Sequence, residues 1–333
     1  MNRCIRRMLT LALCAAVAGA PAAARAWAAG THAYIAKHTN KAKGIVTDAE
    51  LCRRVLGANG PDLFNSVWQD EPQKLAGVLH TGDPAANLSP WHAAEGELQR
   101  AFAFGFASHN DAWGTDSTAH ASGRTFGQGA GYVPAKAAIL GAMLARPFAD
   151  ALGLPLEVAQ ALATDVSHNF VEFAVDFLLV QADPELGWTL YASAGCYAGP
   201  ADDDLLYDAL GLYFAAALSP EDPASRLPEV KAWIDAVERP FVEGLGANGY
   251  VLTLPYAVAK PLIAAQLARE GQEYLAWKYA GLLPPDLPFD LLVRLAEAGL
   301  DAAMPLCAPD FMDEIEATTG WVNGRMSALG IAP

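Results

Sequence analysis

The sequence predicts an all-α fold, and three observations lead to that prediction. Apolar residues recur at helical spacing along most of the chain, whereas runs that alternate apolar and polar residues are scarce. Glycine and proline mark the joints between helical stretches, as at Gly60-Pro61, Gly199-Pro200 and Pro284-Pro285. The chain has 333 residues, enough to bury the core of one large domain or of two smaller ones.

Helical patterns follow one another from the middle of the chain to its end. In order, they cover residues 94–112, 135–153, 155–180, 204–218, 227–245, 290–304 and 310–329. Gly153 to Pro155 separate the second pattern from the third. We expect each stretch to form a helix that turns its apolar face toward the core.

Two segments lack a clear helical pattern. Residues 249–258 are the best strand candidate, although Pro255 interrupts them. Residues 181–203 are expected to form a loop that could separate two helical bundles. We therefore expect a helical core over residues 27–180 and a helical C-terminal region over 181–333, packed on the same domain.

The first 26 residues have the three regions of a secretory signal peptide. A positively charged start precedes an apolar run over residues 8–20, which is too short to span a bilayer. Residues 24–26 form an Ala-x-Ala cleavage site, and residues 26–28 form a second one that would be cut two residues later. We expect the mature chain to be secreted or periplasmic.

The mature chain is strongly acidic. The signal segment holds four of the 22 basic residues and none of the 37 acidic residues, so a net charge near −19 remains. A field of that sign repels polyanions, which makes nucleic acid a less favoured partner. Three cysteines remain, Cys52, Cys196 and Cys307, and the sequence does not show which two would pair.

No transmembrane segment is expected in the mature chain, because charges interrupt every long apolar stretch after residue 26. Residues 250–268 could lie at a membrane interface, although their pattern favours a buried helix pair. Peripheral membrane contact therefore remains an open alternative.

All seven histidines lie within the first 168 residues of this acidic chain. They are His32, His38, His80, His92, His109, His120 and His168. His168 and Glu172 are four residues apart in a helical stretch, so both can reach one cation from the same helix face. Such a pair could also arise by chance or serve as a surface ion pair.

Residues 109–120 hold three more candidate ligands. His109, Asp116 and His120 are separated by nearly whole numbers of helical turns, which would place them near one face of a continuous helix. Gly114 weakens the case for that helix, and Asp111 is a competing carboxylate.

Two further candidates come earlier in the chain. Asp62 follows the Gly-Pro turn and could equally cap a helix, and His80 ends an apolar run. His92 is an alternative to His80. We also expect Asn110, Asp111, Asn169 and Asp83 to orient the imidazole rings.

Zinc is bound by histidine nitrogen and carboxylate oxygen in sites with four ligands. The candidate ligands are Trp27, through the amine that signal cleavage would free, and His32, Asp62, His80, His109, Asp116, His120, His168 and Glu172. Nine groups are too many for one ion. They suit a cluster of two or three ions in which one carboxylate bridges.

The order of these residues resembles the bacterial zinc-dependent phospholipase C family and its relatives, the zinc-dependent single-strand nucleases of fungi and plants. The resemblance covers residues 27–172. It implies an all-α bundle, here with a helical C-terminal extension, and about three zinc ions. It also implies that the amine and carbonyl of an N-terminal tryptophan bind metal, which requires cleavage after Ala26.

The resemblance implies three zinc sites, two of which share Asp116. One would be held by Trp27, His32 and Asp116, a second by His120, His168 and Glu172, and a third by Asp62, His80, His109 and Asp116. The family's central helix usually reads H-x-x-x-D, whereas Trp113 occupies that aspartate position here and Asp116 comes three residues later. Either Asp116 or Asp111 could therefore be the bridging carboxylate.

The resemblance implies an exported zinc-dependent phosphodiester hydrolase, and the phospholipase C branch is favoured. Its substrate would be a phospholipid or another phosphodiester, with Asp62 as the catalytic residue that orients water or accepts its proton. The pair His168 and Glu172 follows the phospholipases, whereas the nucleases usually end in H-x-x-x-D. The five-residue step from Trp27 to His32 is closer to the nucleases. A nuclease or nucleotidase, or an exported zinc-binding protein without catalysis, stays an alternative.

Overall fold

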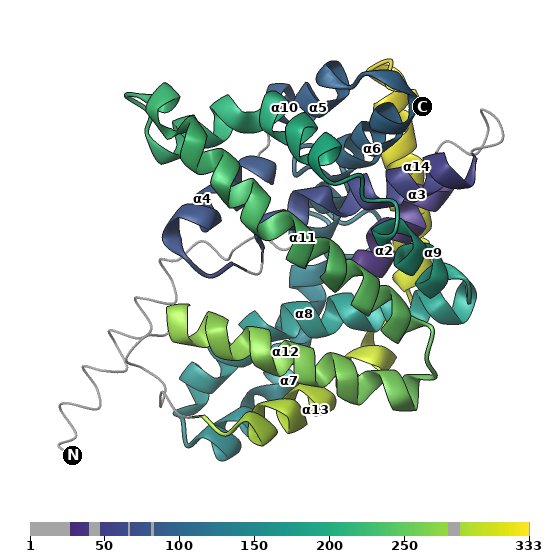
Figure 1. Ribbon diagram of the computed structural model, residues 1–333. Helices are drawn as coiled ribbons and strands as arrows, with labels where there is room; N and C mark the ends of the chain where they lie inside the picture. The colour runs from purple at the N-terminus through teal and green to yellow at the C-terminus, as the bar shows by residue number, and fades with distance from the viewer. Residues whose placement is uncertain (1–26, 40–46, 66, 81–82, 279–286, 333) are drawn as a thin grey trace.

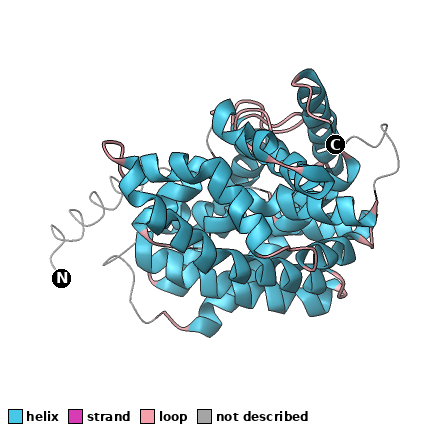
Figure 2. Cartoon of the chain, turned by 45° about the horizontal axis from the view of Figure 1, so that its top comes forward, coloured by secondary structure: helices cyan, strands magenta, loops and turns pink. Residues whose placement is uncertain are grey.

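The computed structural model describes residues 27–39, 47–65, 67–80, 83–278 and 287–332. Within these ranges the chain forms helices joined by turns and loops, and no strand occurs (Figure 2). The expected all-α fold is therefore confirmed. The expected signal peptide lies outside the described residues.

The helices before residue 183, together with the residue that directly follows α4, hold all the histidines. They are α2 (Ala29–His38), α3 (Asp48–Asn59), the 3₁₀-helix η2 (Gly60–Phe64), α4 (Asp70–Leu79), α5 (Pro84–Ala93), α6 (Gly96–His109), the π-helix η3 (Ser117–Ala121), α7 (Tyr132–Leu152) and α8 (Leu156–Ala182), with His80 directly after α4. Local sequence sets several ends. Thr47 and Glu50 form a capping box at the start of α3. Gly153, with φ of 65°, ends α7 in the left-handed conformation that glycine adopts without strain.

The remaining helices complete the bundle. They are α9 (Leu186–Ala194), α10 (Pro200–Leu218), η4 (Pro223–Arg226), α11 (Leu227–Leu252), α12 (Tyr256–Lys278), α13 (Phe289–Cys307) and α14 (Phe311–Ala328). Helices from both halves of the chain pack together, since α13 lies against α7 and α8, and α14 contacts α2 (Figure 1).

Two sequence-based expectations for this region are wrong. Residues 186–194, expected within a loop, form α9, because Leu186 and Leu190 are fully buried against the neighbouring helices α3 and α11. Residues 249–258, the strand candidate, contain the end of α11 and the start of α12. The proline that was expected to interrupt a strand instead lies in the short turn between these two helices.

A disulfide between Cys52 and Cys196 ties α3 to the segment that follows α9. Cys307, in α13, is buried as a free thiol. The structure thereby selects one of the pairings that the sequence left open. A cross-link over 144 residues removes a large loop-closure entropy from the unfolded chain and so stabilises the fold.

Among the described residues, no single helix has both the length and the apolar character needed to cross a bilayer. Of the helices that the structure describes, only α7 and α8 taken together meet that requirement, and they are bent by 117° where they join.

Candidate metal centre

Six segments of the fold bring the candidate ligands to one place. His32 lies on α2, Asp62 on η2, and His80 directly follows α4. His109 is the last residue of α6, and His120 lies on η3 just after Asp116. His168 and Glu172 share one face of α8. The eight side chains fall into groups whose ligand atoms lie within 4.8 Å of one another.

The contact between α3 and α6 sets the position of His109. A Cβ atom added to Gly57 would lie 1.9 Å from a backbone oxygen of α6, and one added to Gly105 would lie 2.0 Å from a backbone oxygen of α3. Only glycine allows the two backbones to approach this closely. The approach brings Nδ1 of His109 to 2.7 Å from the carbonyl oxygen of Ala58.

Residues 110–114 form a turn, so the continuous helix that would have placed His109, Asp116 and His120 near one face does not form, as Gly114 suggested. The side-chain oxygen of Asn110 accepts hydrogen bonds from the backbone N–H groups of Ala112 and Trp113, which ends α6 and folds the chain back. Asp116 comes three residues later than an H-x-x-x-D spacing from His109 would place it, and this turn accommodates those three residues.

A single π-helical turn, η3, follows Asp116. The backbone N–H of Ser122 donates to the carbonyl oxygen of Ser117 over 2.8 Å and closes the turn. Because a π-helical turn is wider than an α-helical one, it places His120 beside the ligands that α8 carries. The chain thus reaches His120 through a turn and a π-helix rather than along one helix face.

Asp116 lies at the centre of the cluster. Its Oδ2 is 2.9 Å from Nδ1 of His80 and 3.0 Å from Nε2 of His109, and its Oδ1 is 3.8 Å from Nε2 of His32. The carboxylate is fully buried. Its two oxygens therefore face different imidazoles, as a bridging ligand requires. Asp111 lies close to His80 and Asp116 but belongs to one group only, whereas Asp116 belongs to two, so Asp116 is the better placed of the two carboxylates to bridge.

His120, His168 and Glu172 form a compact triangle. The two Nε2 atoms are 3.0 Å apart, and Oε1 of Glu172 lies 3.0 Å from His168 Nε2 and 3.7 Å from His120 Nε2. The i, i+4 spacing on α8 therefore does place both side chains around one point, and η3 supplies the third ligand.

The structure also decides between the two alternative histidines. His80 joins Asp62 and His109 in one group, with Nε2 of His80 3.5 Å and Nε2 of His109 3.6 Å from Oδ1 of Asp62. His92 is exposed at the end of α5 and belongs to none of the groups found among the described residues.

The hydrogen bonds around three imidazoles leave their other nitrogens free to bind a cation. A carbonyl oxygen only accepts, so Nδ1 of His109 carries the hydrogen that faces Ala58, and in the neutral ring Nε2 has the lone pair. Thr115 lies 3.2 Å from Nδ1 of His32, so Nε2 of His32 likewise faces the cluster. Asn65 Oδ1 lies 3.1 Å from Nε2 of His80, which leaves Nδ1 toward Asp116.

Two of the four residues that were expected to orient the rings make other contacts. Asn110 shapes its own turn, and the Asp83 side chain caps α5 by accepting the N–H of Ala85. Asn65 and Thr115 take the role instead, because contacts between segments far apart in the sequence bring them to the rings.

Asp176 is a buried residue that the sequence patterns did not single out. It lies one helical turn beyond Glu172 on α8 and accepts hydrogen bonds from the backbone N–H groups of Gly30 and Thr31 at 2.8 and 2.7 Å. These groups belong to the first turn of α2, where a carboxylate is stabilised by the helix dipole. Asp176 therefore anchors the helix that carries His32. Asp176 lies four residues after Glu172, and this helical spacing is the feature of the sequence that could have pointed to it.

Trp27 is the first described residue and is buried, with 1% of its surface exposed. Its ring packs on Tyr132, with centroids 5.3 Å apart. Together with Asp62 and Glu172 it lines a cleft of about 520 Å³ beside the cluster. The predicted cleavage that would free its amine involves a residue outside the described ranges.

Burial and crowding keep two of the histidines neutral. Burial, reinforced by His109, holds the pKa of His32 well below its usual value. Burial and the nearby His168 do the same for the pKa of His120. Neutral imidazole is the form that binds metal.

The pKa of His109 is raised, in contrast to those of His32 and His120, because two carboxylates lie beside its ring. Burial alone would lower the pKa of His109, but Asp116 and Asp62 raise it to about 9. Burial also raises the pKa of Asp62 to about 7, although His109 and His80 oppose this. Burial acts to raise the pKa of Asp116 as well, but His109 and His80 hold it well below its usual value.

Several buried polar atoms of the cluster make no hydrogen bond. They include Nε2 of His32, Nε2 of His109 and Oδ1 of Asp116. A buried polar atom without a hydrogen bond is costly, and a bound cation would satisfy all three. The donor set, imidazole nitrogens with carboxylate oxygens, suits a divalent metal. The residues therefore fit metal ions.

The fold and the site together define an all-α protein with a buried histidine–carboxylate cluster that could hold metal ions. Comparison with known proteins found no matching family model, no matching curated protein and no matching solved structure.

Proposed function

We propose that this chain is an exported zinc-dependent phosphodiester hydrolase of the phospholipase C type. The observation that carries the proposal is the convergence of eight side chains, chosen from the sequence for their order and spacing, into neighbouring buried or partly buried groups. Unrelated histidines would not be expected to meet around a shared carboxylate.

Zinc is the metal that the donor set favours. Two ligand atoms, each about 2.1 Å from one tetrahedrally coordinated zinc ion, lie roughly 3.4 Å apart. The sides of the triangle formed by His120, His168 and Glu172 measure 3.0, 3.0 and 3.7 Å, close to that separation. We propose that this group holds one ion, and that Asp116 bridges two more.

The ligands of those two ions follow from the two sides of Asp116. On one side, His32 would share an ion with Asp116 and the terminal amine of Trp27. On the other, Asp62, His80 and His109 would hold an ion with the same carboxylate. Trp27 lines the cleft beside the cluster, which supports its place in the set.

When bound, the zinc ions supply positive charge that neutralises the substrate phosphate and lowers the pKa of a water molecule. The protein residues do the rest. Asp62 lines the cleft and lies beside two imidazoles, so its carboxylate can orient the attacking water and accept its proton. Asn65 donates a hydrogen bond to Asp62 at 2.5 Å and keeps that carboxylate in place.

Two other features support export and the choice of substrate. A disulfide between Cys52 and Cys196 suits an oxidising compartment outside the cytosol. The acidic chain disfavours nucleic acid as a substrate. The spacing of Trp27 and His32 keeps a zinc-dependent nuclease as the second candidate.

Metal analysis and N-terminal sequencing of the exported protein test the proposal together with activity assays. We expect about three zinc ions per chain and a mature chain that begins at Trp27. We expect hydrolysis of phosphatidylcholine to diacylglycerol and phosphocholine, and little cleavage of single-stranded DNA. Faster cleavage of DNA would favour the nuclease, bound zinc without turnover would favour a binding protein, and absence of bound metal would refute the proposal.

A further inference from the structure

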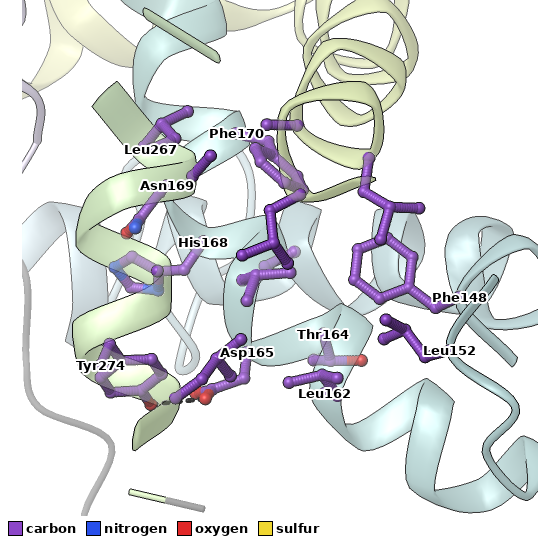
Figure 3. Close-up of a pocket in the computed structure, with 18 of the residues that line it drawn as sticks. Phe148, Leu152, Leu162, Thr164, Asp165, His168, Asn169, Phe170, Leu267 and Tyr274 are labelled. Atoms are coloured by element: carbon purple, nitrogen blue, oxygen red, sulfur yellow. Dashed lines mark hydrogen bonds between the residues drawn. The ribbon is translucent and has the colours of Figure 1, made fainter. Parts of the chain in front are cut away.

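A second cavity lies next to the metal centre and differs in character from the cleft. It has a volume of about 390 Å³ and is enclosed by α7, α8, α12 and α13. Its walls are mostly apolar and include Phe148, Leu152, Leu162, Phe170, Leu267 and Leu295. Figure 3 shows His168 and Asn169 at one side of this cavity, with Phe148 and Leu152 toward the opposite side.

The metal centre lies between the two spaces. His120 and His168 line the apolar cavity, and Glu172, the third member of their group, lines the cleft. Asn169, which lies between His168 and Glu172 on α8, lines both. A molecule whose phosphate lies at this group can therefore extend an apolar chain into the cavity and a polar group into the cleft.

The cleft suits a polar group. Asp62, Asn65, Gln266 and Glu270 contribute carboxylates and amides to it. Two of these residues are carboxylates, and the described residues that line the cleft include no lysine or arginine, so a cationic head group is favoured there.

The size of the apolar cavity falls within the range of small-molecule binding sites. A methylene group occupies a volume similar to that of a water molecule, about 30 Å³, so the cavity suits a chain of roughly a dozen carbons. An apolar cavity of this kind gains favourable contacts when an apolar chain fills it.

We propose that this cavity binds one acyl chain of the substrate and makes the enzyme selective for chain length. The inference rests on the proposed function, because it takes the metal group as the place where the phosphodiester lies. It adds an acyl-chain subsite formed by α7, α8, α12 and α13.

Gly271 offers a way to fill the cavity. It lies on α12, lines the cavity, and a Cβ atom added there would meet no atom within 4 Å. Gly271→Phe should therefore enter free space, and replacing a glycine within a helix also favours helix formation. Gly271→Ala, which adds one methyl group, is the matched control. Gly320→Phe on α14 makes the same change at a site with open space that does not line the cavity.

The measurement is the ratio of two kcat/KM values for each zinc-loaded variant. One is for a phosphatidylcholine with long acyl chains, and the other is for p-nitrophenyl phosphocholine, which has no acyl chain. We expect Gly271→Phe to lower this ratio by about tenfold. We expect Gly271→Ala and Gly320→Phe to leave it within about twofold of the wild-type ratio. An unchanged ratio in a folded, zinc-loaded Gly271→Phe protein would overturn the subsite.

A second variant changes the length of the cavity. Leu152 lies toward the side opposite His168, so Leu152→Ala should lengthen the space (Figure 3). We expect the preferred acyl chain to become longer by about two methylene groups, which a general loss of stability would not cause. The fluorescence of cis-parinaric acid, a fatty acid that emits in apolar sites, gives an independent readout: it should rise with wild type and much less with Gly271→Phe.

The outcomes also separate this subsite from the proposed function. If the wild type hydrolyses the chain-free substrate but shows no chain-length preference, the subsite is wrong and the hydrolase proposal stands. If the zinc-loaded wild type hydrolyses neither substrate, the proposed function itself is wrong. Binding of parinaric acid without hydrolysis would leave an apolar binding site and refute its role as a subsite for catalysis.

Discussion

The cluster contains a group of candidate ligands on and beside α8 and a second group around Asp116, and the two are built in different ways. His168 and Glu172 are four residues apart on α8, and only His120 comes from another segment. The group around Asp116 draws on α2, on η2, on the end of α4 and on the end of α6. Asp116 is fully buried, whereas the side chain of His168 keeps 18% of its surface exposed.

This difference has an energetic consequence. A change in the Asp116 group leaves buried imidazoles and carboxylates without a partner, which is costly. A change in the α8 group affects fewer segments and a partly exposed side chain. The comparison therefore predicts that the cluster depends most on Asp116 and less on Glu172, and the following experiments test that order.

Asp116→Asn should have the largest effect. The neutral amide cannot bridge two cations with two anionic oxygens, so we expect bound zinc to fall from about three ions to about one. We expect kcat/KM to fall by roughly a thousandfold or more. Metal analysis and phosphodiesterase assays measure both. Asp150→Asn, at an exposed carboxylate on α7, is the matched control and should change neither.

Glu172→Gln should have a smaller effect. Two of the three ligands in its group remain, and the Asp116 group stays intact, so we expect the loss of about one ion. We expect activity to fall by about a hundredfold. Glu157→Gln, on the exposed first turn of α8, is the control. A greater loss of zinc in Glu172→Gln than in Asp116→Asn would contradict the order that the comparison predicts.

Asp176→Asn tests the anchor of α2. The amide can accept fewer and weaker hydrogen bonds from Gly30 and Thr31 than the carboxylate does. We expect zinc affinity to fall by about tenfold to a hundredfold, since such changes act through the position of a ligand. Titration of the metal-free protein with zinc measures the change. Unchanged affinity would show that α2 holds its place without this contact.

The pH dependence of stability should distinguish the metal-free from the zinc-loaded protein. In the metal-free protein, burial opposes protonation of His109, but Asp116 and Asp62 raise its pKa from 6.5 to about 9. A raised histidine pKa stabilises the fold fully below pH 6.5, and this contribution is lost as pH rises through about 9. We expect the free energy of unfolding of the metal-free protein to fall by about 3 kcal/mol over this range.

The zinc-loaded protein should behave in the opposite way. Zinc binding requires neutral imidazole, so its affinity rises as His109 loses its proton, and the bound state gains stability with increasing pH. Denaturant unfolding of both forms at several pH values measures the two slopes. Parallel slopes would mean that His109 does not bind the metal.

The sequence could predict those features of this protein that depend on local order. Helical spacing was enough for the all-α fold, and the pair His168 and Glu172 followed from the geometry of one helix. The strand candidate at residues 249–258 and the loop at 181–203 were wrong, because burial against other helices decided those segments. Local preference is weaker than tertiary packing in such stretches.

The sequence by itself determined which residues have metal-binding chemistry and the helices that carry several of them. Only the tertiary structure decided that His80 rather than His92 belongs to the cluster, that Asp116 rather than Asp111 belongs to two of its groups, and that Cys52 pairs with Cys196. The physical reason is that these choices depend on contacts between segments far apart along the chain. Close approaches such as that of α3 and α6 at Gly57 and Gly105 create those contacts.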